Sequence, residues 1–155
     1  MNQYYAVSAG GEGDSTIQVY SLAKKATVHI FKHSDEVSYV SFGPIKTDYA
    51  KKLISSSRDR TVRIWDIEEE KMEKKFKHDG KCTSFDIAKD AATLAVSYGS
   101  REGKSKSGVS VWSIQDQKQM ANIKTDSAAQ DVRFNRSDTE IAVGCRKGQI
   151  YKISL

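Results

Sequence analysis

The stretch Lys52–Ile67, KLISSSRDRTVRIWDI, contains the pattern that decides the fold. A run of small and aliphatic residues at 52–56 and a second run at 61–67 flank the polar turn Arg58-Asp59-Arg60. Short runs of this kind on either side of a polar turn are typical of paired antiparallel strands. The second run contains the dipeptide Trp65-Asp66, and its pattern returns elsewhere in the chain.

The spacing of this second run indicates the architecture. Its four copies are Thr16–Leu22 (TIQVYSL), Thr61–Ile67 (TVRIWDI), Gly108–Ile114 (GVSVWSI) and Gln149–Leu155 (QIYKISL). The anchor residues at intervals of 45, 47 and 41 positions are Tyr20, Trp65, Trp112 and Ile153. This period is far longer than a coiled-coil heptad and is typical of one four-stranded propeller blade.

Two further phrases precede the copies, and we name the strands of each unit a, b, c and d in chain order. Strand a is predicted at Val37–Phe42, Cys82–Ile87 and Ala129–Phe134, and strand b at Tyr5–Ser8, Lys52–Ser56, Thr93–Ser97 and Glu140–Gly144. The charged segment Glu68–Lys77 is predicted to be an outer strand and not a helix. The sequence therefore predicts an all-β fold, a partial β-propeller of four-stranded antiparallel blades in one unit over residues 1–155. The expected blades are 1–31 (strands b to d), 32–77, 78–124 and 125–155 (strands a to c).

The sequence resembles the WD-repeat (WD40) β-propeller family along its whole length, most closely from Lys32 to Phe76. In that family a His, a Ser, an Asp and a Trp form a hydrogen-bonded tetrad within one blade. The resemblance implies a structural tetrad of His33, Ser55, Asp59 and Trp65. Three of these residue types also make a hydrolase triad, but the Gly-x-Ser-x-Gly turn that presents a nucleophile is absent from the sequence. We therefore expect no catalytic residues and no enzyme activity.

The other blades match the tetrad only in part. The residues concerned are His78, Ser97 and Trp112 with Lys106 in place of Asp in blade three, Ser8, Asp14 and Tyr20 in blade one, and Thr125 and Lys147 in place of His and Asp in blade four. One complete tetrad among four in-phase copies makes the resemblance specific.

The net charge of +5 is concentrated in the loops between strands b and c of blades two to four. The candidate partner-binding residues in these loops are Arg58, Arg60, Arg101, Lys104, Lys106, Arg146 and Lys147. Two interpretations remain open. The loops are either solvated linkers that keep the protein soluble, or a basic rim for an acidic peptide, an acidic tail or a phosphate backbone.

Several function classes are disfavoured by the sequence. No apolar run approaches the length of a membrane span, and the first nine residues do not resemble a signal peptide. Cys82 and Cys145 lie far apart, so we expect no metal site, no cofactor and reduced thiols in the cytoplasm or nucleus. The glycine-rich segment Gly10–Asp14 lacks the Gly-Lys-Ser/Thr ending of a phosphate loop and is predicted to be a hairpin loop.

About three and a half blades cannot close a ring of seven, as this family usually does. The first and last blades would then expose apolar faces, so we expect the chain to be completed or supported by other protein. A complementary half-propeller chain, self-association through the open faces and a fragment of a longer polypeptide all remain open. The function we expect is a scaffold or adaptor for protein–protein interactions in a multiprotein complex. The alternative is a subunit that contacts RNA or another polyanion through its basic loops.

Overall fold

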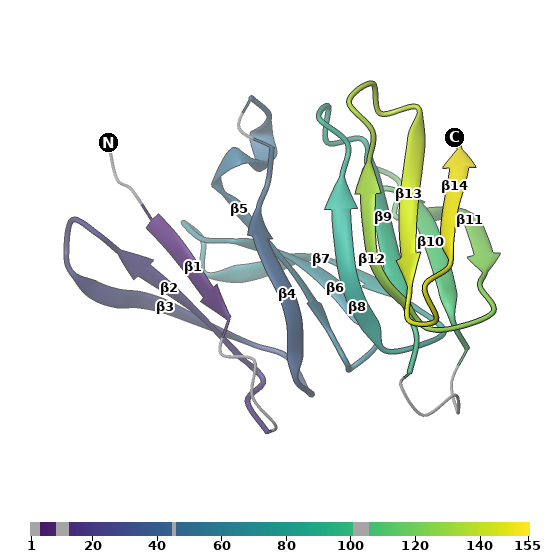
Figure 1. Ribbon diagram of the computed structural model, residues 1–155. Coiled ribbons are helices and arrows are strands. Elements are labelled where there is room, and N and C mark those ends of the chain that lie inside the picture. Colours follow the sequence, from purple (N-terminus) through teal and green to yellow (C-terminus); the bar gives the residue numbers. More distant parts are fainter. Residues whose placement is uncertain (1–3, 9–12, 45, 101–105) are drawn as a thin grey trace.

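The chain folds into four antiparallel β-sheets that stand side by side in an open arc (Figure 1). The computed structural model describes residues 4–8, 13–44, 46–100 and 106–155, with side chains from residue 13 onward. The helix present in these ranges is a single 3-10 turn, η1 (Asp48–Lys51). The predicted fold class, an all-β partial propeller, is confirmed, and the ring is not closed.

Each sheet is a meander in which neighbouring strands follow one another in the sequence. Blade one contains β1 (Tyr4–Ser8), β2 (Thr16–Ser21) and β3 (Ala26–Lys32). Blade two contains β4 (Val37–Phe42), β5 (Lys52–Ser57), β6 (Thr61–Asp66) and β7 (Lys71–Lys77). Blade three contains β8 (Cys82–Ile87), β9 (Thr93–Tyr98), β10 (Gly108–Ser113) and β11 (Lys118–Lys124). Blade four contains β12 (Ala129–Phe134), β13 (Glu140–Cys145) and β14 (Ile150–Ser154).

The charged segment that was predicted to be an outer strand is β7, which begins after a turn at 67–70. Only Phe76 of this strand is buried, and it packs edge-to-face on Trp112 of the next blade at 5.6 Å. A strand at the outer edge of a sheet buries little of its surface, so charged residues are tolerated along it.

Side-chain alternation along each strand fills the spaces between blades. In β6, Val62 and Ile64 point to one side and join the cluster shared with blade three, whereas Trp65 joins the cluster shared with blade one. A third cluster lies between blades three and four and includes Val111 and Val143. Successive side chains of a strand point to opposite faces, so each blade has two apolar faces and depends on its neighbours for their burial.

The inner strands β4, β8 and β12 stand next to one another and are joined by side-chain hydrogen bonds (Figure 1). The Ser38 hydroxyl donates to the carbonyl of Cys82 at 2.7 Å, and the Thr83 hydroxyl donates to the carbonyl of Ala129 at 2.8 Å. Ser38 and Thr83 are the second residues of their strands, and Gln130 has this position in β12. We call the end of the blades where these bonds lie the top; in Figure 1 this end points downward.

The outward face of blade four, which we expect from the sequence to be apolar, contains both an exposed apolar residue and a charged pair. Val109 and Val111 of β10 are buried against blade four, and the corresponding residues of β14 are Ile150 and Lys152. Ile150 is 80% exposed, but Lys152 forms an ion pair with Glu140 at 2.8 Å. A charged pair at this position protects an edge strand from nonspecific pairing.

Candidate functional site

Four polar side chains meet in the interior at the top of blade two. His33 precedes β4, Ser55 lies in β5, Asp59 lies in the turn that follows, and Trp65 lies in β6. The Nε2 atom of His33 is 2.7 Å from the Ser55 hydroxyl, and the Trp65 indole donates to the same oxygen at 2.8 Å. The Nδ1 atom of His33 is 2.9 Å from the Asp59 carboxylate. The structure thus brings all four residues of the predicted tetrad into one hydrogen-bonded chain.

The Asp59 carboxylate determines the protonation of this chain. Because a carboxylate only accepts hydrogen bonds, Nδ1 of His33 carries the proton and Nε2 accepts from the Ser55 hydroxyl. Burial lowers the pKa of His33, although Asp59 opposes the shift, so the imidazole is uncharged at neutral pH. Burial by itself would raise the pKa of Asp59, but hydrogen bonds from His33 and Thr61 outweigh it and hold that pKa well below its usual range. Arg63 also pairs with Asp59 at 2.7 Å.

The equivalent chain is broken in blade three, where Ser97 was predicted to take the place of Ser55. Ser55 lies opposite the residue that comes two positions before Trp65. The residue of β9 that has this relation to Trp112 is Val96. The prediction for Ser97 is therefore wrong by one residue, which places its side chain on the other face of the strand.

Two polar atoms of blade three have no partner as a result. The rings of His78 and Trp112 lie edge-to-face at 5.5 Å, close to the 5.8 Å between His33 and Trp65. Nδ1 of His78 is 2.7 Å from the Ser110 hydroxyl, but Nε2 and the Trp112 indole nitrogen are buried without a hydrogen-bond partner. Burial lowers the pKa of His78 to about 4. Blade three therefore keeps both rings and lacks the oxygen that joins them in blade two.

Blades one and four depart further from the tetrad. The pairing of β1 with β2 gives Val7, and not the predicted Ser8, the position of Ser55. Asp14 accepts from the backbone and the hydroxyl of Thr16, each at 2.8 Å, as Asp59 does from Thr61. In blade four the Thr125 hydroxyl donates to the carbonyl of Ser127 at 2.8 Å.

The predicted basic residues do not gather in one place. Arg58 pairs with Glu36 at 2.7 Å, and Lys106 pairs with Asp79 at 3.3 Å. Arg60, Arg146 and Lys147 are exposed in the turns of blades two and four. Arg101 and Lys104 lie outside the described residues. Of the described candidate partner-binding residues, Arg58 is the one that lines a pocket.

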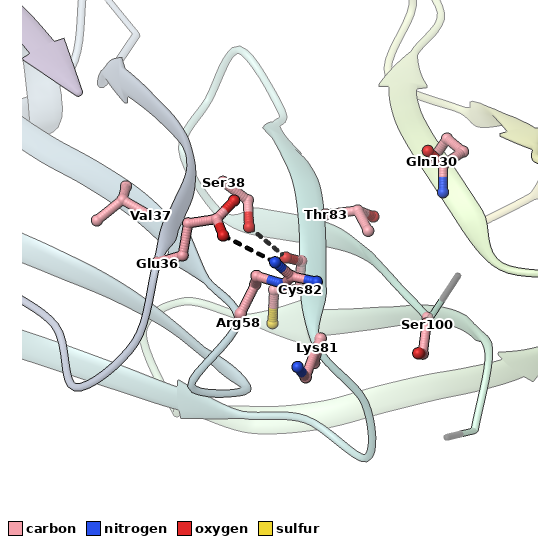
Figure 2. A pocket seen from close by; sticks show the side chains of 10 residues that line it. Glu36, Val37, Ser38, Arg58, Lys81, Cys82, Thr83, Ser100 and Gln130 are labelled. Atoms are coloured by element: carbon pink, nitrogen blue, oxygen red, sulfur yellow. Dashed lines mark hydrogen bonds and ion pairs between the residues drawn. The ribbon is translucent and has the colours of Figure 1, made fainter. Parts of the chain in front are cut away.

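This pocket lies at the top between blades two and three and has a volume of about 350 Å³. Its lining residues are Glu36, Val37, Ser38, Arg58, Lys81, Cys82, Thr83, Gly99, Ser100 and Gln130. Figure 2 shows Arg58 bridged to Glu36 and close to Lys81, with Gln130 on a separate strand across the pocket. Sequence reasoning missed Lys81 and Gln130 as site residues, because the pocket joins segments from three blades.

The pocket is built for polar recognition. Hydroxyl, amide and charged groups line most of it, and the lining includes no aromatic side chain. Burial raises the pKa of the Cys82 thiol well above its usual value, so this sulfur is a protonated part of the wall. A second pocket of about 210 Å³, with a mixed polar and apolar lining, lies at the other end of the same inner strands and includes Tyr39 and Phe85.

The described residues show no cluster of three or more His, Cys, Asp or Glu side chains that could hold a metal ion. In the part of the chain that the structure describes, no helix has the length and apolar character needed to cross a bilayer.

The repeated antiparallel blades define the class of fold, an all-β partial propeller that is not closed. Residues 25–66 match the family described as WD domain, G-beta repeat, and the sheets of the whole chain are consistent with blades of such repeats. Domains of this family are generally non-catalytic interaction modules. Comparison with curated proteins finds no match.

Proposed function

We propose that this chain is a non-catalytic scaffold or adaptor that binds other proteins within a multiprotein complex. The observation that carries the proposal is the polar pocket at the top of blades two and three, held by the hydrogen-bonded strands β4, β8 and β12. Residues on rigid strands keep their positions when a partner docks, which lowers the entropy lost on binding.

The tetrad supports a non-catalytic function because its serine is buried and serves to hold the blade together. The Ser55 side chain is completely buried and already bonded to His33 and Trp65. A nucleophile must reach its substrate, so a serine in this position does not serve a hydrolase.

The experiment is capture of partners from native extract on immobilised protein, followed by mass spectrometry. The matched comparison is a variant with Glu36→Lys and Arg58→Glu, which keeps the ion pair and reverses its direction inside the pocket. Partners that are lost with this variant and retained by an Arg60→Glu variant support docking at the pocket. Equal recovery on all three proteins contradicts it.

A second candidate function is contact with RNA or another polyanion through Arg60, Arg146 and Lys147. The exposure of these three residues favours it, and the absence of aromatic side chains from the pocket lining speaks against base stacking there. Phosphate contacts release counterions, so the logarithm of the affinity would fall steeply as salt rises. A binding constant that is unchanged by salt or by mutation of these residues to Ala would exclude this function.

We further propose that another protein completes the arc at the outward face of blade four, either a complementary half-propeller or a second copy of the chain. Ile150, at 80% exposure, is the residue that such a partner would cover. Light scattering of the purified protein tests the second copy, since self-association raises the measured mass with concentration. Localisation in the cytoplasm or nucleus is supported by the two free, buried cysteines, and microscopy of a tagged protein tests it.

A further inference from the structure

The first residue after strand b can be compared position by position in blades two, three and four. In each blade, the residue after strand b donates its backbone N–H to the residue before strand a at 2.9 Å. The donors are Arg58, Gly99 and Arg146, and the acceptors are Glu36, Lys81 and Ala128. Arg58, Gly99 and Arg146 are therefore equivalent, as are Glu36, Lys81 and Ala128.

Blade three reverses the charge that blade two has at this place. In blade two, Arg58 and Glu36 form an ion pair at 2.7 Å. In blade three, a lysine replaces the glutamate and a glycine replaces the arginine. Lys81 consequently has no carboxylate beside it, and none of the described residues forms an ion pair or a hydrogen bond with its ammonium group. The pocket holds one cation that nothing in the described chain neutralises.

The packing of blades three and four requires the glycine at position 99. A Cβ atom at this position would lie 2.7 Å from the Cα atom of Ala128 in the next blade. Backbone atoms cannot yield to such a contact, so no larger residue fits here. Blade three therefore has no guanidinium at the position of Arg58, and Lys81, Gly99 and Gln130 all line the pocket.

From these observations we propose that the pocket binds a carboxylate of an acidic peptide segment, with Lys81 as the charged donor and the Gln130 amide as a second donor. This inference rests on the proposed scaffold function and names the partner chemistry of that site. The ligand carboxylate would take the part that Glu36 has toward Arg58 in blade two. Gln130 is exposed, and its position corresponds to Ser38 and Thr83, whose side chains each bond to the next inner strand.

Charge and shape favour a carboxylate over a phosphate. One unpaired cation balances one carboxylate, whereas a phosphate monoester carries about two negative charges, one more than Lys81 balances. The lining has no aromatic ring on which a base could stack. An RNA ligand is thus the less suitable occupant, and the experiment includes it as a competing outcome.

The experiment measures the anisotropy of a fluorescent octaglutamate peptide titrated with the folded protein, with an octaglutamine peptide and octauridylate RNA as comparison probes. Lys81→Gln is expected to weaken octaglutamate binding about fivefold, and Lys81→Glu is expected to abolish it. Gln130→Ala provides a second, independent variant with a smaller loss. Lys77→Gln is the matched control, because this exposed lysine lies four residues away and outside the pocket lining.

Three results would overturn the inference. They are equal weakening by Lys81→Gln and Lys77→Gln, tighter binding of octauridylate than of octaglutamate, and no saturable binding of octaglutamate at all. Unfolding curves of each variant confirm that a lost signal is not a lost fold. The proposed scaffold function is tested by a different result. It is contradicted if native extract yields no partner protein, and it is retained if partners are captured whether or not Lys81 is present.

Discussion

Nε2 of His78 and the indole nitrogen of Trp112 are buried without a hydrogen-bond partner in blade three. A serine buried beside them should therefore be more stabilising than an alanine, the reverse of the usual order in an apolar core. Val96 is completely buried, and the strand pairing gives it the position that Ser55 has in blade two. A serine at this position would place a hydroxyl within reach of both orphan nitrogens, because the two ring pairs have nearly the same separation. We therefore predict that Val96→Ser is more stable than Val96→Ala.

The magnitude follows from three contributions. Truncation of valine to alanine removes two buried methyl groups and costs about 2 kcal/mol. In an apolar core, replacing that alanine by serine costs a further ~1–3 kcal/mol for the buried hydroxyl. At position 96 the hydroxyl instead bonds to His78 and Trp112, and each bond relieves about 1 kcal/mol or more of an existing desolvation penalty. The serine variant should exceed the alanine variant by ~1–2 kcal/mol in free energy of unfolding.

The assay is equilibrium urea unfolding of wild type, Val96→Ser and Val96→Ala. Blade four supplies the matched control at Val143, which has the same strand position, is also completely buried and faces no His–Trp pair. At this site the order must be the usual one, with Val143→Ala more stable than Val143→Ser. If Val96→Ser is no more stable than Val96→Ala, the orphan atoms are not the cause that we assign, and the register argument for blade three fails.

Three further predictions concern the tetrad, pH and the open face. Asp59→Ala should lower the free energy of unfolding by roughly 1–3 kcal/mol, since it leaves the His33 and Thr61 donors unsatisfied. Thermal and urea unfolding measure this change, and an unchanged stability would contradict a structural role for the tetrad. His78 has a folded pKa of about 4, below its ordinary value, so the unfolded chain takes up the proton first and stability is lost as pH falls from 6.5 to about 4. The free energy of unfolding of wild type should therefore fall by about 2 kcal/mol more than that of His78→Gln between pH 7 and pH 5. Equal dependence of the unfolding free energy on pH in the two proteins would refute this. Lys152→Val introduces the residue that β10 carries at this position, where β6 has Ile64, and should cause self-association that rises with concentration in light scattering. An unchanged mass would show that the ion pair with Glu140 does not protect this face.

The fold and the blade-two tetrad were predictable because short-range spacing specifies both. Asp59 lies six residues before Trp65, and Ser55 lies ten before it, with a three-residue turn between the strands. In blade three a longer loop separates β9 from β10, so spacing no longer tells which residue of β9 faces Trp112. The strand pairing does tell, and a shift of one residue exchanges Val96 for Ser97.

The pocket could not be predicted from the same data. Its lining comes from Arg58, Lys81 and Gln130, which lie in three blades and far apart in the sequence. Counting basic residues in loops selected Arg58, which lines the pocket, and also Lys106, whose charge is paired with Asp79. Loop charge is visible in a sequence, whereas the pairing of that charge is a property of the packed blades.

The departures of blade three from blade two all lie at the top of the molecule. Val96 replaces the tetrad serine, Lys106 replaces the tetrad aspartate, and Gly99 and Lys81 replace an arginine–glutamate pair. In blade two the equivalent residues form the tetrad bonds and the Arg58–Glu36 ion pair, and blade three lacks these interactions. Proteins often give up local stability where a binding site is formed. If this holds here, Val96→Ser should stabilise blade three without changing octaglutamate affinity, since Lys81 lines the pocket and Val96 does not. A variant that improves stability and abolishes binding would instead show that the pocket depends on the loosened interior of the blade.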